Sequence, residues 1–371
     1  MTIEDMTAEP AMLVLARESR GWTQADVAEA MSHLEVGGRI SQGYVSRAEA
    51  GRLTVTGDRL LLFATALRYS PEVLCSPVNV HGVGIGLVHH RKRASMGITG
   101  LRRIHATLAL TRMQTKALTR AAGMTGEHRF HHIPVSALDS PQDAAEQLRE
   151  HWNLPPGPIV DLVAVVEQAG ALVVTRDLET GELDAVSQWS QGERPLFLLN
   201  STTPPDRFRF SLAHELGHVV MHTEPGTGRE QEEQADRFAA EFLMPYEDIT
   251  ADLKQGVDLA RLLELKGRWG VSMAALVRRA LTLNVISDWQ YRNIMVEMSA
   301  LGYRTAEPGA VPREMPRGMA HVVNRLQQHH GLSVAQAARV AGLSPDEFDE
   351  IYRCASSLPE SLRSRHVSEV S

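Results

Sequence analysis

The sequence predicts a mostly helical α+β protein with a small sheet in the middle of the chain. Apolar residues recur at helical spacing through most of the 371 residues, whereas strand-like runs occur at 171–176, 185–189 and 195–199. Hydrophobic residues make up 43% of the chain and charged residues 22%, which suits a globular protein that buries a core. A chain of this length has room for about two to three domains.

Clusters of proline and glycine divide the chain into four parts. We expect a domain of short helices at 8–75, a basic helical connector at 76–139, a central domain at 140–300, and a C-terminal helical segment with a loose tail at 301–371. The three strand-like runs all fall in the central domain, after helices expected near 141–152 and 159–169.

Charge is distributed unevenly along the chain, which has a net charge of −7. Residues 1–125 contain 15 Lys and Arg residues against 10 Asp and Glu residues, and no acid occurs from Val73 to Gly126. The basic residues of this stretch include the run Arg91, Lys92 and Arg93. A basic front half on an acidic chain indicates an anionic partner for that half, with a solvated helix face as the alternative.

The composition excludes several classes of protein. No run of about 18 apolar residues occurs, so we expect no membrane-spanning helix. Residues 1–20 carry acids and lack a continuous apolar stretch, which argues against a secretory signal. The two cysteines, Cys75 and Cys354, are far apart and form no C-x-x-C motif. This excludes a disulfide framework and a cysteine zinc site, and it predicts a cytoplasmic protein.

The N-terminal domain contains two short helices with clear start signals. Thr23 stands at the N-cap position of the first helix, after the helix-breaking Gly21. Ser41 opens the second helix, whose inner face carries Val45 and Ala48. A third apolar helix face follows, formed by Leu60, Leu61, Phe63, Ala64 and Leu67.

These two helices carry the pattern T-Q-x-x-V-A followed by S-Q-x-x-V-S-R-x-E-x-G. Over about 60 residues the segment resembles the helix-turn-helix of Cro and phage repressors (the Xre family), with a longer loop at 32–39 between the helices. The resemblance implies a five-helix-type bundle that binds double-stranded DNA. The alternative is a helical bundle used only for contacts with other proteins.

The second helix has side chains suited to a major groove. Its candidates for DNA contact are Ser41, Gln42, Tyr44 and Arg47. Glutamine can pair with adenine, and arginine with guanine or phosphate. By the resemblance, Gln24 at the N-terminus of the preceding helix holds a backbone phosphate. Glu49 would repel phosphate, so we expect it to form an internal ion pair.

The central domain contains one H-E-x-x-H sequence within an apolar helical pattern. On a helix, His214 and His218 project from one face at a spacing that suits a zinc ion. Glu215 lies one position round the helix, where it can reach a water at the metal rather than the metal itself. His222 continues the i, i+4 series, but the face rotates by about 40° every four residues, so we expect it to pack or to support a ligand.

A zinc site needs a third protein ligand, and the next helix offers acids. Residues 232–245 read E-x-Q-A-D-x-F-A-x-x-F-L-M-P, which after H-E-L-G-H is similar to the ImmA/IrrE family of zinc peptidases. The resemblance covers about residues 140–300 and implies a zincin-like fold with Glu232 as the third ligand. Glu233 is the alternative by proximity. Asp236, one turn after Glu232, is placed to support a ligand histidine.

The C-terminal segment is expected to be helical and to dock rather than to bind DNA. Residues 332–344 look like a second helix-turn-helix, but residues 345–350 are acidic and would repel phosphate. Four tryptophans lie in regular helical or strand patterns and are expected in the core: Trp152, Trp189, Trp269 and Trp289.

The two resemblances together imply a DNA-binding regulator with a zinc-dependent endopeptidase domain that cleaves a regulatory protein such as a repressor. In that mechanism Glu215 accepts a proton from the attacking water and passes it to the leaving amine. Two alternatives stay open: a transcription regulator whose zinc domain is a sensor or structural module, or an antitoxin- or immunity-type protein that acts by binding a partner. The expected partners are double-stranded DNA and a repressor or toxin-like protein. No membrane partner is expected, and a homodimer is the candidate assembly.

Overall fold

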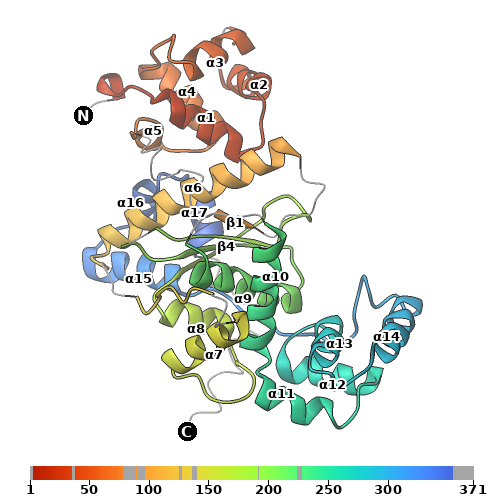
Figure 1. The fold of residues 1–371 in the computed structure, drawn as a ribbon. Coiled ribbons are helices and arrows are strands. Elements are labelled where there is room, and N and C mark those ends of the chain that lie inside the picture. Colours follow the sequence, from red (N-terminus) through yellow and green to blue (C-terminus); the bar gives the residue numbers. More distant parts are fainter. Residues whose placement is uncertain are drawn as a thin grey trace. The chain divides into compact units, whose positions relative to one another are not determined.

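The computed structural model describes residues 3–35, 38–77, 88–90, 97–124, 128–135, 140–190, 192–223 and 228–353. The chain is mostly helical with one small sheet, as the sequence predicts (Figure 1). It divides into two compact units, Met1–Gly84 with Arg93–Gly126 and Arg317–Ser371, and Ile85–Lys92 with Glu127–Pro316. The basic run at 91–93 and the tail after Pro359 lie outside the described residues.

The first unit begins with a short 3-10 turn and five helices: η1 (Ile3–Asp5), α1 (Pro10–Ser19), α2 (Gln24–Leu34), α3 (Gln42–Glu49), α4 (Gly57–Leu67) and α5 (Pro71–Leu74). The predicted helix starts are confirmed, because the hydroxyls of Thr23 and Ser41 each accept a backbone hydrogen bond at the N-cap of α2 and α3. The predicted apolar face of α4 is buried except at Leu61, which is 38% exposed.

The first unit is completed by one long helix and three C-terminal helices: α6 (Ile98–Ala121), α15 (Gly318–His330), α16 (Val334–Ala341) and α17 (Pro345–Tyr352). Helix α6 packs against both α1 and α16. The hydroxyl of Tyr352 donates a hydrogen bond to Gln114 of α6 at 2.9 Å. Glu347 of the acidic α17 forms an ion pair with Arg20, the residue that follows α1. The predicted docking role of this acidic segment is therefore confirmed.

The second unit contains a four-stranded sheet in the order β1-β3-β4-β2: β1 (Val88–His90), β2 (Leu172–Arg176), β3 (Ala185–Gln188) and β4 (Leu196–Asn200). Strands β2 and β4 are parallel, whereas β3 is antiparallel to both of its neighbours. All residues of β3 and β4 are buried. The sequence predicts β2, β3 and β4 within one residue at each end, but it does not predict β1.

Among the described residues the second unit also contains eight helices: α7 (Pro141–His151), α8 (Leu162–Gln168), α9 (Pro205–Met221), α10 (Arg229–Leu243), α11 (Tyr246–Leu253), α12 (Leu259–Trp269), α13 (Met273–Thr282) and α14 (Asp288–Ala300). Helix α9 packs on β3 and β4, and α10 packs along α9. Gly217 makes this close packing possible, because a Cβ atom there would lie 2.9 Å from the ring of Phe238.

Three of the four tryptophans lie in the core as predicted, but Trp289 is 72% exposed. Its helix, α14, buries only Met298, so most of that helix faces away from the core. A helical pattern alone does not say which face a neighbouring element covers, and the prediction for Trp289 is wrong for that reason.

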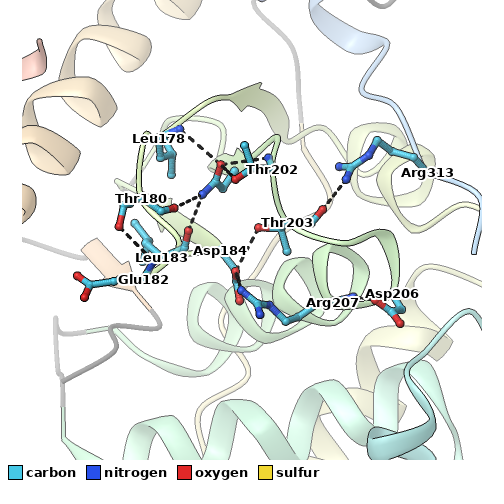
Figure 2. A network of polar contacts seen from close by, with 11 residues as sticks. Leu178, Thr180, Glu182, Leu183, Asp184, Thr202, Thr203, Asp206, Arg207 and Arg313 are labelled. Carbon is cyan, nitrogen blue, oxygen red and sulfur yellow. Dashed lines mark hydrogen bonds and ion pairs between the residues drawn. The ribbon is translucent and has the colours of Figure 1, made fainter. Parts of the chain in front are cut away.

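One buried amide organises the loop between β2 and β3. The Nδ2 atom of Asn200, at the end of β4, donates hydrogen bonds to the carbonyls of Thr180 at 2.7 Å and Leu183 at 3.0 Å. Asp184, directly before β3, forms an ion pair with Arg207 in the first turn of α9 (Figure 2). These contacts fix one end of the sheet to the start of the helix that carries H-E-x-x-H.

Within the described ranges, none of the helices combines the length and the apolar composition that a membrane crossing requires.

Candidate metal centre

Three side chains from α9 and α10 converge on one point. His214 and His218 are fully buried on α9, and their Nε2 atoms are 3.1 Å apart. Glu232, in the first turn of α10, places Oε2 at 3.4 Å from His214 Nε2 and Oε1 at 3.5 Å from His218 Nε2. Ligand atoms around a tetrahedral zinc ion are about 3.3 Å apart, given metal–nitrogen distances of about 2.0–2.1 Å. The group is therefore spaced to hold a metal ion.

Hydrogen bonds behind the histidines direct their Nε2 lone pairs toward this point. His214 Nδ1 lies 2.9 Å from Asp236 Oδ1 and donates a hydrogen bond to that carboxylate. His222 Nε2 donates to Gln234 Oε1 at 2.9 Å, and burial lowers the pKa of His222, which keeps it neutral. The unprotonated Nδ1 of His222 then accepts from His218 Nδ1 at 3.0 Å. Both histidines thus place a proton on Nδ1, so that Nε2 is the nitrogen that faces the point of convergence and that a metal would bind once His214 has released its second proton.

The geometry separates the two acids that compete for the role of third ligand. Glu233 lies on the outer side of α10, where its carboxylate accepts a hydrogen bond from Arg229 Nε at 2.8 Å. Only Glu232 belongs to the converging group. His222 is not part of that group and instead contacts His218 from behind.

Glu215 is the buried acid beside the group. Its Oε2 accepts a hydrogen bond from the hydroxyl of Ser187 at 2.6 Å, whereas Oε1 has no hydrogen-bond partner among the described residues. Burial raises the pKa of Glu215 to about 7, although the charge of His214 and the hydrogen bond from Ser187 act in the opposite direction. An unpartnered carboxylate oxygen in a buried site indicates a water or ion at that place.

No motif in the sequence identifies Ser187. It is a fully buried residue in the middle of β3, and its partner Glu215 is on α9. The signal in the sequence is a hydroxyl within the strand-like run at 185–189, since a hydroxyl in a buried strand needs a hydrogen-bond partner.

The electrostatics of the group favour a bound cation. Burial alone would lower the pKa of His214, but hydrogen bonds with Asp236 and Glu232 raise it to about 9. His218 lacks a carboxylate on Nδ1, and burial lowers its pKa to about 4. Burial acts to raise the pKa of Glu232, but the two histidines, whose Nε2 atoms lie 3.4 and 3.5 Å from its oxygens, hold that pKa far below its usual range. In the metal-free chain a protonated His214 therefore lies beside an ionised Glu232. A metal ion can replace the proton of His214 and supply the positive charge in its stead.

The residues predicted to contact DNA lie on α2 and α3. Ser41, Gln42 and Arg47 are exposed, and Gln24 and Tyr44 are half-buried. Gln42 Nε2 donates to Gln24 Oε1 at 2.8 Å, which joins the N-terminal ends of the two helices. Glu49 forms the predicted internal ion pair, because Arg17 Nε donates to its carboxylate at 2.6 Å.

Tyr44 is tied to its own domain more closely than the other candidates. Its ring stacks on Phe63 with the ring centroids 6.3 Å apart, and the guanidinium of Arg59 lies 5.6 Å from the centre of the Tyr44 ring. Burial by these neighbours raises the pKa of the phenol. The packing fixes the orientation of the side chain at the surface of α3.

Comparison with protein families gives two matches. Residues 13–74 match the helix-turn-helix family, which implies DNA binding, and residues 166–281 match the IrrE N-terminal-like domain of the Peptidase_M78 family. The second match contains β2, β3 and β4, the H-E-x-x-H helix and Glu232. A comparison with curated proteins found no match. The chain therefore combines an Xre-type helix-turn-helix domain with an IrrE N-terminal-like domain that carries a His-His-Glu group able to hold a metal ion.

Proposed function

We propose that the chain is a DNA-binding regulator whose central domain is a zinc-dependent endopeptidase, and that it cleaves a regulatory protein such as a repressor. The observation that carries this proposal is the position of Glu215, a buried acid with one unpartnered oxygen next to the His-His-Glu group. A structural zinc ion is usually closed by four protein ligands. Three ligands beside a carboxylate that does not bind the metal are instead the arrangement of a hydrolytic site.

The donor set supports zinc as the metal. Two imidazole nitrogens and one carboxylate are ligands that zinc takes in catalytic sites, with one position left open. The residues that would hold it are His214, His218 and Glu232. When bound, zinc supplies Lewis acidity, which polarises the scissile carbonyl and makes a water easier to deprotonate.

The proton transfers fall to Glu215. With its pKa raised to about 7, this carboxyl can accept a proton from the attacking water near neutral pH and return it to the leaving amine. Ser187 holds one oxygen of the carboxyl in place through its hydrogen bond. Asp236 and His222 keep the two histidines in the tautomer that binds metal.

For the N-terminal domain we propose double-stranded DNA as the partner. Gln42 and Arg47 are exposed on α3 and would read bases together with Ser41, whereas Gln24 at the start of α2 would hold a phosphate. Tyr44, half-buried on the same helix, would contact the DNA from the same surface. A homodimer is the proposed assembly, because helix-turn-helix proteins commonly read paired half-sites as dimers. A DNA partner and the near absence of cysteine support a cytoplasmic location.

The experiment compares cells that carry the wild-type chain, Glu215→Gln or His214→Ala. Glu215→Gln removes the proton acceptor but none of the metal ligands, so it should retain zinc and DNA binding while hydrolysis falls by about 10²–10⁴-fold. A regulator protein that is cleaved only by the wild type supports the proposal. If Glu215→Gln cells respond normally while His214→Ala cells do not, the zinc domain senses or binds a partner, and the protease proposal is wrong.

A further inference from the structure

Strand β1, which lies between α5 and α6 in the sequence, is part of the sheet of the second unit. Val88, His89 and His90 pair antiparallel with β3, opposite Gln188, Ser187 and Val186 respectively. The same strand also contacts α9, the H-E-x-x-H helix. In the sequence, β1 lies between α5 and α6, both of which belong to the unit that contains the helix-turn-helix.

Strand β3, with which β1 pairs, is the strand that contacts Glu215, the candidate catalytic acid. Ser187 in the middle of β3 donates its hydroxyl to Glu215 at 2.6 Å, and His89 is the residue in register with Ser187. With the strand order β1-β3-β4-β2, β3 would be an edge strand if β1 were removed. The opposite edge is β2, which is parallel to β4 and separated from β3 by it.

An open strand edge binds extended peptides by adding them as a further strand through main-chain hydrogen bonds. A peptide that lies on β3 in this way would pass Ser187 and so run beside Glu215. We propose that the edge of β3 is the substrate-binding edge and that β1 of the same chain covers it. A substrate strand would then have to displace β1 before it could pair with β3. The inference rests on the proposed function in that it takes Glu215 as the centre of hydrolysis.

The covalent tether gives β1 an advantage over a peptide in solution. A tethered segment competes at an effective concentration that can reach the millimolar range. Even a three-residue strand can therefore weaken the binding of a free peptide to β3. Both ends of β1 continue into the unit that contains the helix-turn-helix. Displacement of β1 therefore acts on a segment that is joined to the DNA-binding domain on each side.

The test uses the full-length chain in a Glu215→Gln background, so that no peptide is cleaved. Val88→Pro and His89→Pro are introduced together, because adjacent strand residues point their N–H groups in opposite directions and proline removes whichever one faces β3. The matched control is Val88→Ala with His89→Ala, which retains both N–H groups. The probe is a fluorescent synthetic peptide of residues 85–92, and binding is followed by fluorescence anisotropy.

We expect the double-proline chain to bind the peptide about tenfold more tightly than the parent, and the double-alanine chain to stay within about threefold of the parent. Hydrogen exchange of the β3 amides should be faster in the double-proline chain and slow down again when the peptide is added. Equal protection of β3 in the parent and the double-proline chain, or equal peptide affinity in both, would overturn the proposal. Neither readout depends on zinc or on hydrolysis, so a failure here is distinguishable from a failure of the proposed function.

Discussion

Ser187 on β3 and Glu215 on α9 are joined by a hydrogen bond of 2.6 Å between two fully buried side chains. The bond is a polar link between the sheet and the H-E-x-x-H helix, and it lowers the pKa of Glu215 against the opposing effect of burial. It also fixes Oε2 of the carboxyl, so that Oε1 is the oxygen available to a water.

The first prediction concerns the removal of this hydrogen bond by Ser187→Ala. Without the hydroxyl, the pKa of Glu215 should rise further above about 7, so that less of the base is ionised at neutral pH. We expect the acid limb of the pH profile for peptide cleavage to move to higher pH, while the zinc content is unchanged. Ser211→Ala is the matched control, because Ser211 is also a buried serine, lies on α9 itself, and has a hydroxyl without a hydrogen-bond partner among the described residues. An acid limb that is the same in both variants would contradict the positioning role of Ser187.

The second prediction distinguishes the two neighbouring acids of α10. Glu232→Ala removes a carboxylate that faces both histidines, whereas Glu233→Ala removes one that pairs with Arg229 at the surface. We expect zinc affinity to fall by more than about 100-fold in the first variant and to change little in the second, because loss of even a supporting residue costs about 10–100-fold. Competition with a chelator measures both variants. The reverse order would move the third ligand by one residue.

The third prediction is that zinc binds more tightly as the pH rises. The pKa of His214 is raised to about 9 in the metal-free chain, so near pH 7 this histidine is protonated and zinc must displace the proton from Nε2. Apparent zinc affinity should therefore increase by about tenfold per pH unit between pH 7 and 9. The stability of the metal-free fold should change in the opposite sense: the contribution from His214 is complete below about pH 6.5 and is lost as the pH rises toward 9.

Chelator competition at several pH values, together with thermal unfolding of the metal-free chain, checks both parts of this prediction. Asp236→Asn provides the control, since it removes the carboxylate that accepts the proton of His214 Nδ1 and should make zinc affinity less dependent on pH. A zinc affinity that does not vary between pH 7 and 9 in the unsubstituted chain would show that His214 is already neutral.

Local relationships in this fold could be read from the sequence. The four-residue spacing of His214 and His218 predicts that they share one helix face, and their Nε2 atoms do meet at 3.1 Å. The cap residues Thr23 and Ser41 likewise act within one turn of their own helices. Such relationships depend on helix geometry alone, so no knowledge of the tertiary structure is required.

Relationships between distant segments could not be read in this way. Ser187 contacts Glu215 only because β3 packs on α9. No feature in the sequence of either segment identifies the other as its neighbour. Strand β1 has three residues, which is too short for an alternating pattern to be recognised. The ion pair between Arg20 and Glu347 joins the two ends of the chain, and charge alone does not identify either residue as the partner of the other.

The last prediction concerns how α3 reads DNA. Arg47 and Gln42 are exposed on this helix, so Arg47→Ala and Gln42→Ala should each reduce the preference for the operator over unrelated DNA, by about 1–3 kcal/mol if the contact to a base is bidentate. Tyr44→Phe should have a smaller effect, because the ring keeps its contacts with Phe63 and Arg59 and only the hydroxyl is lost. Titrations of operator and unrelated DNA at several salt concentrations separate the possibilities. If Arg47→Ala weakens both DNAs equally and reduces the salt dependence by about one ion, then Arg47 binds phosphate rather than a base, and sequence recognition must come from other residues of α3.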